Sequence, residues 1–242
     1  MIINPYRFSA AGGFDGFGNA SRAFDGTNDY IDIGDVLDSV TSGTGAVFTL
    51  ALWVKSTSLD DGICFSKVEA TVSNSRSYFL RVLSTGELGC ILYGDGNSTK
   101  RFGRQTSTSG SISASTWHHV AIIYDQSSTG DYLRMFIDGV EDTSLTDYFS
   151  NGTFVSIYDG TAPVQISGYQ EGDFAWGGNL ADVRIYDADI GATEIANLAV
   201  GTDYQTNLVG WWLDDDDDVL DNAGSNDGTN NGSTYSTDGP AD

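Results

Sequence analysis

Carboxylates are the most abundant groups in this sequence that could do chemistry. Aspartate and glutamate together number 34, yet only five of these residues are glutamates. Retaining glycoside hydrolysis needs two carboxyl groups about 5–5.5 Å apart, and no two glutamates have a spacing that places both on one strand face. Glu171 and Asp173 come nearest to an acidic pair. We therefore expect a protein that is not an enzyme.

The two histidines and two cysteines do not form a recognisable catalytic or zinc motif. His118 and His119 are adjacent, so in a strand they point to opposite faces and cannot share a metal ion. We expect one to be buried and hydrogen-bonded and the other exposed. Cys64 and Cys90 could pair if their strands are neighbours. We favour buried free thiols, because the sequence does not open with a secretory signal pattern.

The overall charge narrows the choice of partners. Against 34 acidic residues stand 11 lysines and arginines, which gives a formal net charge of −23. Such a surface repels duplex DNA and anionic membranes, and no apolar stretch approaches the roughly 20 residues of a membrane-spanning helix. We expect no nucleic-acid partner and no membrane insertion. Lys100, Arg101 and Arg104 form a local basic patch, expected in a solvated hairpin that could also dock an acidic partner.

Apolar residues mostly alternate with polar ones, which is the period of β-strands. In residues 48–55, Phe48, Leu50, Leu52 and Val54 fall on one face. Further strands are predicted at residues 78–82, 88–93, 117–124, 132–137, 164–166 and 180–186. Asp-Gly pairs, which supply the positive φ of tight turns, punctuate the sequence. This pattern predicts an all-β, two-sheet antiparallel sandwich, with one short helix at residues 189–200 near the C-terminus.

The two ends of the chain differ in composition from the middle. Residues 1–22 are rich in glycine, alanine, serine and phenylalanine and are expected to form an N-terminal arm. Residues 23–213 are expected to form the sandwich, with a closing strand at 208–213. Residues 214–242 form an acidic and Gly/Asn-rich tail, expected to be loop beyond Asp221.

Several segments occur in a fixed order: residues 24–33 (FDGTNDYIDI), 48–55 (FTLALWVK), 117–121 (WHHVA), 132–139 (ending FIDG) and 178–187 (GNLADVRIYD). This order resembles the laminin-G-like jelly-roll domains of the concanavalin A-like lectin/glucanase superfamily. The resemblance implies a jelly roll of two face-to-face sheets. In that family a segment like residues 208–213 often precedes the FDG motif, whereas here it follows the domain. We favour a strand that closes the sandwich over the start of a further unit, because Trp211 and Trp212 would otherwise be exposed.

The same resemblance implies a calcium site. Members of the superfamily often hold calcium between the turn after the first strand and a late strand. The matching positions here are Asp25, the Gly26 carbonyl and Asp182, with Asn28 or Asp29 assisting. The alternative is that Asp25-Gly26 is only a hairpin turn and Asp182 a surface residue. Enzymes of the superfamily resemble one another in a Glu-x-Asp-x-x-Glu strand, and the segment at Glu171 lacks the final glutamate.

A sugar-binding site needs exposed aromatic faces and planar hydrogen-bonding groups. The candidates are aromatic and acidic residues expected in loops: Tyr93, Asp95, Tyr158, Asp159, Tyr169 and Trp176. Trp176 is the best of them, because neighbouring glycines would leave its face open. Trp53 and Trp117 are expected in the core.

These observations predict a non-enzymatic binding or structural module. Its composition, rich in asparagine, glycine, serine and threonine, resembles that of bacteriophage structural proteins. We favour a virion component such as a capsid decoration, head-fibre or tail-fibre protein. Its expected partners are then other virion proteins or a second copy of itself, and it would be made in the host cytoplasm. A glycan-binding adhesin that contacts a cell-surface glycan is the alternative, and a glycoside hydrolase is the third hypothesis.

Overall fold

The structure is a computed structural model of the 242-residue chain. It describes residues 20–38, 45–69, 71–128, 132–169, 174–213 and 218–240. Most of the predicted N-terminal arm, the Glu171 and Asp173 positions, and aspartates 214–217 lie outside the described residues. Among the described residues, no helix has the length and apolarity needed to span a membrane.

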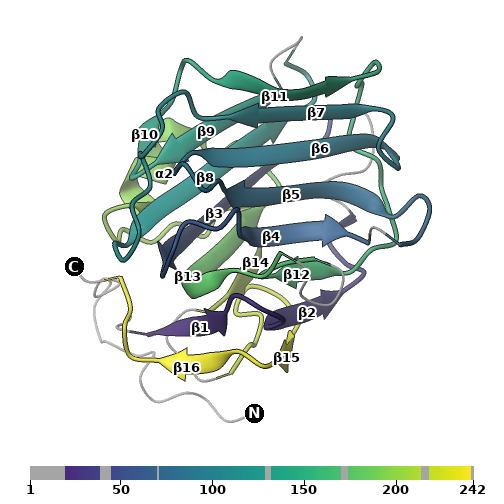
Figure 1. The fold of residues 1–242 in the computed structure, drawn as a ribbon. Helices are drawn as coiled ribbons and strands as arrows, with labels where there is room; N and C mark the ends of the chain where they lie inside the picture. Colours follow the sequence, from purple (N-terminus) through teal and green to yellow (C-terminus); the bar gives the residue numbers. More distant parts are fainter. Residues whose placement is uncertain are drawn as a thin grey trace.

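Two antiparallel sheets lie face to face, with sheet B in front of sheet A in Figure 1. Sheet A has the strand order β10-β9-β8-β3-β13-β1-β16, and β14 also pairs with β13. Its strands are β1 (Ser21–Asp25), β3 (Val47–Ser56), β8 (His118–Asp125), β9 (Leu133–Ile137), β10 (Val140–Glu141), β13 (Gly177–Tyr186), β14 (Leu208–Trp212) and β16 (Thr234–Ser236).

Sheet B has the strand order β11-β7-β6-β5-β4-β12-β2-β15. Its strands are β2 (Tyr30–Gly34), β4 (Ile63–Val68), β5 (Arg76–Val82), β6 (Leu88–Gly96), β7 (Arg101–Gln105), β11 (Thr146–Asn151), β12 (Val164–Ile166) and β15 (Thr229–Asn231). The predicted all-β jelly-roll sandwich is therefore confirmed.

The core fills the space between the two sheets. The alternating residues predicted for one face of β3 are fully buried there, and Phe48 meets Tyr78 of sheet B with ring centroids 5.2 Å apart. Cys64 and Cys90 are buried free thiols, as predicted. Burial raises the pKa of both thiols, so they remain protonated and behave as small apolar side chains.

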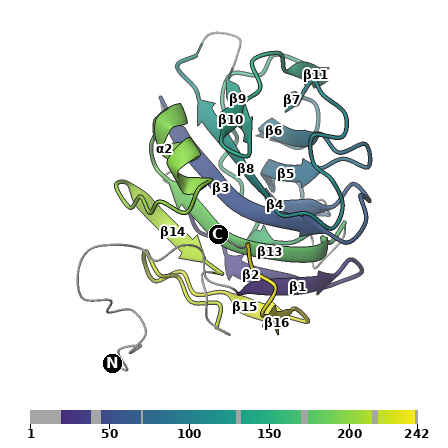
Figure 2. The same ribbon diagram turned by 90° about the vertical axis from the view of Figure 1, so that its left-hand side faces the viewer.

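The predicted helix is present as α2 (Gly191–Leu198) and covers the outer face of sheet A (Figure 2). Its buried residues Ile195 and Leu198 pack in one cluster with Ala121, Phe136 and Tyr186 of that sheet. Sheet B has its own apolar cluster on the outer face, which contains residues of β4, β5 and β6. The two outer faces are therefore covered in different ways.

The C-terminal segment differs from its prediction. The strand expected at 208–213 is present as β14, which pairs with β13, and Trp212 is fully buried. The expectation of loop beyond Asp221 was wrong, because β15 pairs with β2 and β16 pairs with β1. These strands are three residues each, too short for a period-two pattern. They satisfy backbone groups that the edges of β1 and β2 would otherwise leave unpaired.

The prediction for the two strand tryptophans was half right. Trp53 is buried, with 8% of its surface exposed. Trp117 is half-buried, and its indole N–H donates to the Asp238 carboxylate at 3.3 Å. The ammonium of Lys55 lies 5.9 Å from the centre of the same ring. Trp117 therefore contacts the C-terminal segment and does not belong to the core.

Asp221 tests the structural role of the C-terminal segment. Its buried carboxylate accepts the backbone N–H groups of Trp211, Ala223 and Asn226 at 3.0–3.1 Å. Asp221→Ala should lower the unfolding free energy by about 1–3 kcal/mol, because these donors lose their acceptor. Urea unfolding measures it, with the exposed Asp218→Ala as the matched control. Equal stability of the two variants would show that the segment is a loosely held tail.

Candidate functional site

Aromatic side chains form a row on the outer face of sheet B. Phe79 of β5 and Tyr93 of β6 point outward because their chain neighbours Tyr78 and Leu92 point into the core. The ring centroids of Phe79 and Tyr93 are 6.3 Å apart, those of Phe79 and Tyr169 are 6.4 Å apart, and those of Tyr169 and Phe174 are 5.6 Å apart. Phe174 is 59% exposed. We call these four residues the aromatic row.

Two arginines enclose a second pair of aromatic rings on the same face. The Arg81 guanidinium carbon lies 4.6 Å from the ring centre of Tyr148, and that of Arg101 lies 4.5 Å from the ring centre of Phe149. Tyr148 and Phe149 pack edge to face, 4.6 Å apart. Arg81 also donates to the Tyr148 hydroxyl. We call Arg81, Tyr148, Phe149 and Arg101 the arginine stack.

A glycine in β6 makes room for this arrangement. Gly89 pairs with Arg81 across the β5–β6 ladder, and a Cβ atom at Gly89 would lie 3.6 Å from Arg81 Cγ and 2.8 Å from Leu83 Cδ1. The bare backbone lets the long Arg81 side chain lie across β6 towards β11, where Tyr148 meets it. The absence of a side chain at Gly89 leaves the outer face of β6 open beside Arg81.

The electrostatic setting of the arginine stack is unusual for this chain. Among the described residues, neither Arg81 nor Arg101 forms an ion pair with a carboxylate, and the Nε atom of each is buried without a hydrogen-bond partner. Burial lowers the pKa of Arg81, an effect that the more distant Asp61 partly offsets. By contrast, Arg134 on sheet A pairs with Glu141 at 2.7 Å and with Asp189 at 3.3 Å.

The residues predicted to bind glycans divide into three groups. Tyr93 and Tyr169 come together on sheet B through Phe79, which the sequence analysis did not single out. Asp95 accepts the Asn97 backbone N–H at 3.0 Å within the β6–β7 hairpin, and Tyr158 packs against the backbone there, with its N–H bonded to the Tyr93 carbonyl at 2.7 Å. Asp159 is largely exposed. The partial burial of its carboxyl group, together with the charge of Asp38, raises its pKa.

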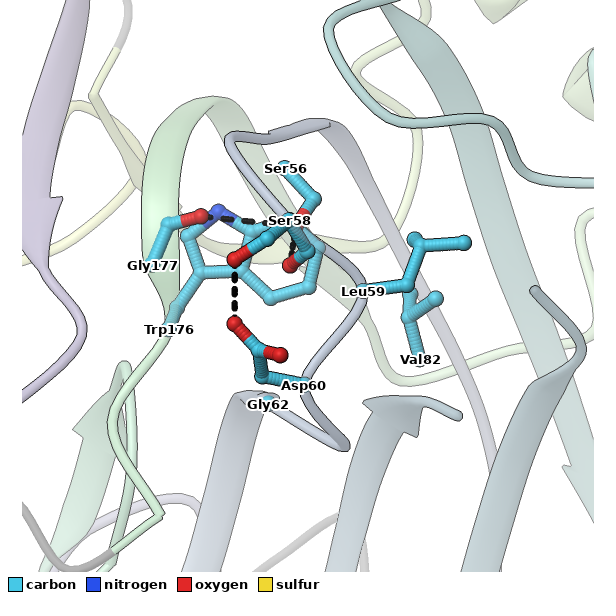
Figure 3. A pocket seen from close by; sticks show the side chains of 8 residues that line it. All are labelled: Ser56, Ser58, Leu59, Asp60, Gly62, Val82, Trp176 and Gly177. Carbon is cyan, nitrogen blue, oxygen red and sulfur yellow. Dashed lines mark hydrogen bonds between the residues drawn. The ribbon is translucent and has the colours of Figure 1, made fainter. Parts of the chain in front are cut away.

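The prediction of an open Trp176 face was wrong. The side chain is 1% exposed and belongs to the core between the sheets, where its indole N–H donates to the Asn179 carbonyl at 3.2 Å. Its ring closes the floor of a small hollow between the β3 end and β13 (Figure 3). That hollow has room for about one water molecule. Ser58 donates to Asp60 there, and the hollow does not fit a sugar ring.

The three residues of the predicted basic patch do not lie on one surface. Arg101 faces outward in the arginine stack, whereas Arg104 lies over Phe102, contacts Asp147 and belongs to the other side of β7. Lys100 is exposed at the start of the strand. Strand alternation separates side chains that are close in sequence, so the patch is not one surface.

The structure separates the residues predicted to bind calcium. Asp25 pairs with Gly177 at one end of β1, whereas Asp182 lies beyond the other end. The Asp182 carboxylate is buried, and its Oδ1 accepts from Arg184 Nε and Trp211 Nε1, both at 2.8 Å. The described residues contain no group of three or more metal-ligating side chains.

The remaining candidates fit a cation only in part. Oδ1 of Asp25 accepts the Thr27 N–H at 2.7 Å, and Oδ2 of Asp29 accepts the Asp25 N–H at 2.9 Å, next to the Gly26 turn and Asn28. Each carboxylate therefore already stabilises the turn with one oxygen. Calcium at this turn stays a prediction, which melting curves with calcium and with a chelator would test.

His118 lies in an arrangement that resembles a catalytic triad. Its Nδ1 is 2.8 Å from an Asp138 carboxylate oxygen, and its Nε2 is 3.1 Å from the Ser113 hydroxyl. However, the Ser113 backbone N–H also donates to Nε2, at 3.1 Å. Because that nitrogen has one lone pair, the backbone bond leaves it unable to take a proton from the hydroxyl. The arrangement anchors the loop at Ser113 to the β9–β10 turn.

His119 is also buried, so the expectation of one exposed histidine was wrong. Its ring packs edge-on against Trp53, with centroids 5.4 Å apart. Burial lowers the pKa of His119 to about 3, an effect that Asp138 opposes and Arg184 reinforces. His119 is thus a buried, neutral residue on the outer side of sheet A.

His119 should make the stability of the protein depend on pH. Below its unfolded pKa of about 6.5 the unfolded state binds a proton that the folded state excludes. The unfolding free energy should therefore fall by about 1.4 kcal/mol per pH unit from pH 6 towards pH 4 on this account alone. His119→Gln should lack this part of the slope in urea unfolding at each pH. Parallel slopes for the two proteins would refute the buried neutral imidazole.

The two face-to-face antiparallel sheets define a jelly-roll domain. The family model described as concanavalin A-like lectin/glucanases superfamily matches residues 25–196. The chain belongs to this superfamily, which agrees with the resemblance seen in its sequence motifs. No curated protein matches the chain significantly.

Solved structures share the fold at low sequence identity. A Bacteroides ovatus protein, provisionally described as carbohydrate binding, superposes with a TM-score of 0.62 at 17% identity over 91% of this chain; the match spans 60% of that protein. The CBM40 module of the Ruminococcus gnavus IT-sialidase, solved with α2,3-sialyllactose, gives a TM-score of 0.56 at 13% identity, covering 78% of this chain and all of that module. These likenesses establish the fold.

The sequence analysis missed Phe79, Phe174, Arg81, Tyr148 and Phe149. The strand at 78–82 carried a usable signal, because Phe79 and Arg81 alternate with the core residues Tyr78 and Leu80. No comparable signal marked Tyr148 and Phe149, because β11 has a register shift between Asp147 and Phe149. That irregularity places two neighbouring aromatic residues together on the outer face.

Proposed function

We propose that the protein is a non-enzymatic glycan-binding module that binds sugar on the outer face of sheet B. The observation that carries the proposal is the aromatic row beside the arginine stack. These side chains come from β5, β6, β7 and β11 and from the segment at Tyr169 and Phe174. Most are held by neighbouring strands, so the surface is formed before a ligand arrives.

The chemistry of this surface suits a saccharide. Sugar rings present C–H groups that pack on aromatic faces, while their hydroxyls need hydrogen-bonding groups at the edges. Phe174 offers an exposed ring, and Arg81 and Arg101 offer planar donors. The hydroxyls of Tyr148 and Tyr169 add groups that both donate and accept. The predicted pair Tyr93 and Tyr169 is part of this surface.

The two other hypotheses have less support. The role as a virion component remains a prediction from amino-acid composition, and co-sedimentation with particles would test it. Glycan attachment is compatible with that context, because a virion protein can also bind a sugar. The hydrolase hypothesis would require release of reducing sugar, and the structural neighbours compared above include binding modules.

Phe174 provides the direct test of glycan binding. A glycan array should first identify a bound sugar, and isothermal titration calorimetry should then measure its affinity. Phe174→Ala should weaken binding about fivefold, because an aromatic contact contributes about 1 kcal/mol. Val155→Ala, at another exposed apolar residue, is the control. Absence of any retained glycan, or equal affinity of Phe174→Ala and wild type, would contradict the proposal.

A further inference from the structure

The arginine stack carries positive charge that no described carboxylate neutralises. The chain has about three acidic residues for each basic one, and Lys55, Lys67, Arg104, Arg134 and Arg184 each pair with a described carboxylate. Arg81 and Arg101 pair with none among the described residues. Both lie on one face of sheet B, on either side of Tyr148 and Phe149.

The two guanidinium groups are also partly withdrawn from water. Each packs against an aromatic ring, and each has a buried Nε–H without an acceptor among the described residues. Leaving such a buried donor without a hydrogen bond costs free energy. A charged acceptor recovers more of that free energy than a neutral acceptor does. Cation–π contacts offset part of the cost but satisfy no N–H group.

We propose that the outer face of sheet B selects a saccharide that carries an anionic group, a carboxylate or a sulfate, which Arg81 and Arg101 bind. This inference rests on the proposed glycan-binding function and adds the class of sugar. A guanidinium presents a planar fork of N–H donors that matches the oxygens of both anions. Tyr169 and Phe174, the rings of the aromatic row that are not buried, then pack against the sugar ring that carries the anion.

The charge of the whole protein sharpens this selectivity. A net charge of −23 repels anions from most of the surface. An anionic sugar therefore binds only where local positive charge outweighs that field. The stack is such a place, because Tyr93 also lies near Arg101 and Arg76, whose charges oppose the burial that raises its pKa.

The first experiment needs no variant. An array that carries uronate, sialylated and sulfated glycans beside neutral glycans should retain the protein mainly on acidic sugars. The strongest acidic ligand should lose binding about 10- to 100-fold when its carboxylate is esterified or its sulfate is removed. Loss on esterification identifies a carboxylate, and loss on desulfation identifies a sulfate. Binding to neutral glycans alone, or undiminished binding after neutralisation, would overturn the inference while leaving the proposed function in place.

Variants then place the anion on the stack. Arg81→Gln and Arg101→Gln should each weaken the acidic ligand about 10-fold or more in calorimetry, with the neutral form of the ligand little affected. Arg134→Gln removes an arginine that is paired on sheet A and should bind like wild type. Arg101→Lys keeps the charge and should bind better than Arg101→Gln. Equal affinity of all folded variants would overturn the inference, whereas no binding to any glycan would reject the proposed function as well.

Discussion

Strand alternation is the constraint on which this structure depends. In a sandwich of two sheets, every strand sends one set of side chains into the core and the other set outward. The inner set of β3 and β5 joins in one core, as the contact of Phe48 with Tyr78 shows. What the protein can bind is then decided by how each outward set is covered.

The two outer faces meet this constraint differently. On sheet A, α2 buries Ile195 and Leu198 against the outward residues, and Arg184 and His119 are enclosed there with their neighbours. On sheet B the outward residues are aromatic rings and arginines, which pack against one another, cover the apolar surface and leave Phe174 exposed. Long side chains with apolar stems and charged ends suit this task. The same residues that protect sheet B therefore also present a surface for a ligand.

The sequence predicted the sandwich well because its signals are local. Alternation marked β3 and β5, and the short helix was expected within residues 189–200, where α2 lies. The site was predicted only in part, because it combines residues from four strands and a later segment. Trp176 illustrates the difficulty: its glycine neighbours suggested exposure, yet the turn of the chain before β13 directs the ring into the core. Asp182 likewise pairs with Arg184, two residues away on β13.

A direct measurement of where the glycan lies tests the central claim that sheet B supplies the binding surface. Backbone amide shifts of ¹⁵N-labelled protein, recorded with and without the glycan selected on the array, would map the contact. The account predicts that the largest changes fall in β5, β6, β7 and β11, around Arg81, Tyr93, Arg101 and Tyr148. Changes centred on the Asp25 turn or on the outer face of sheet A, with sheet B unaffected, would contradict it.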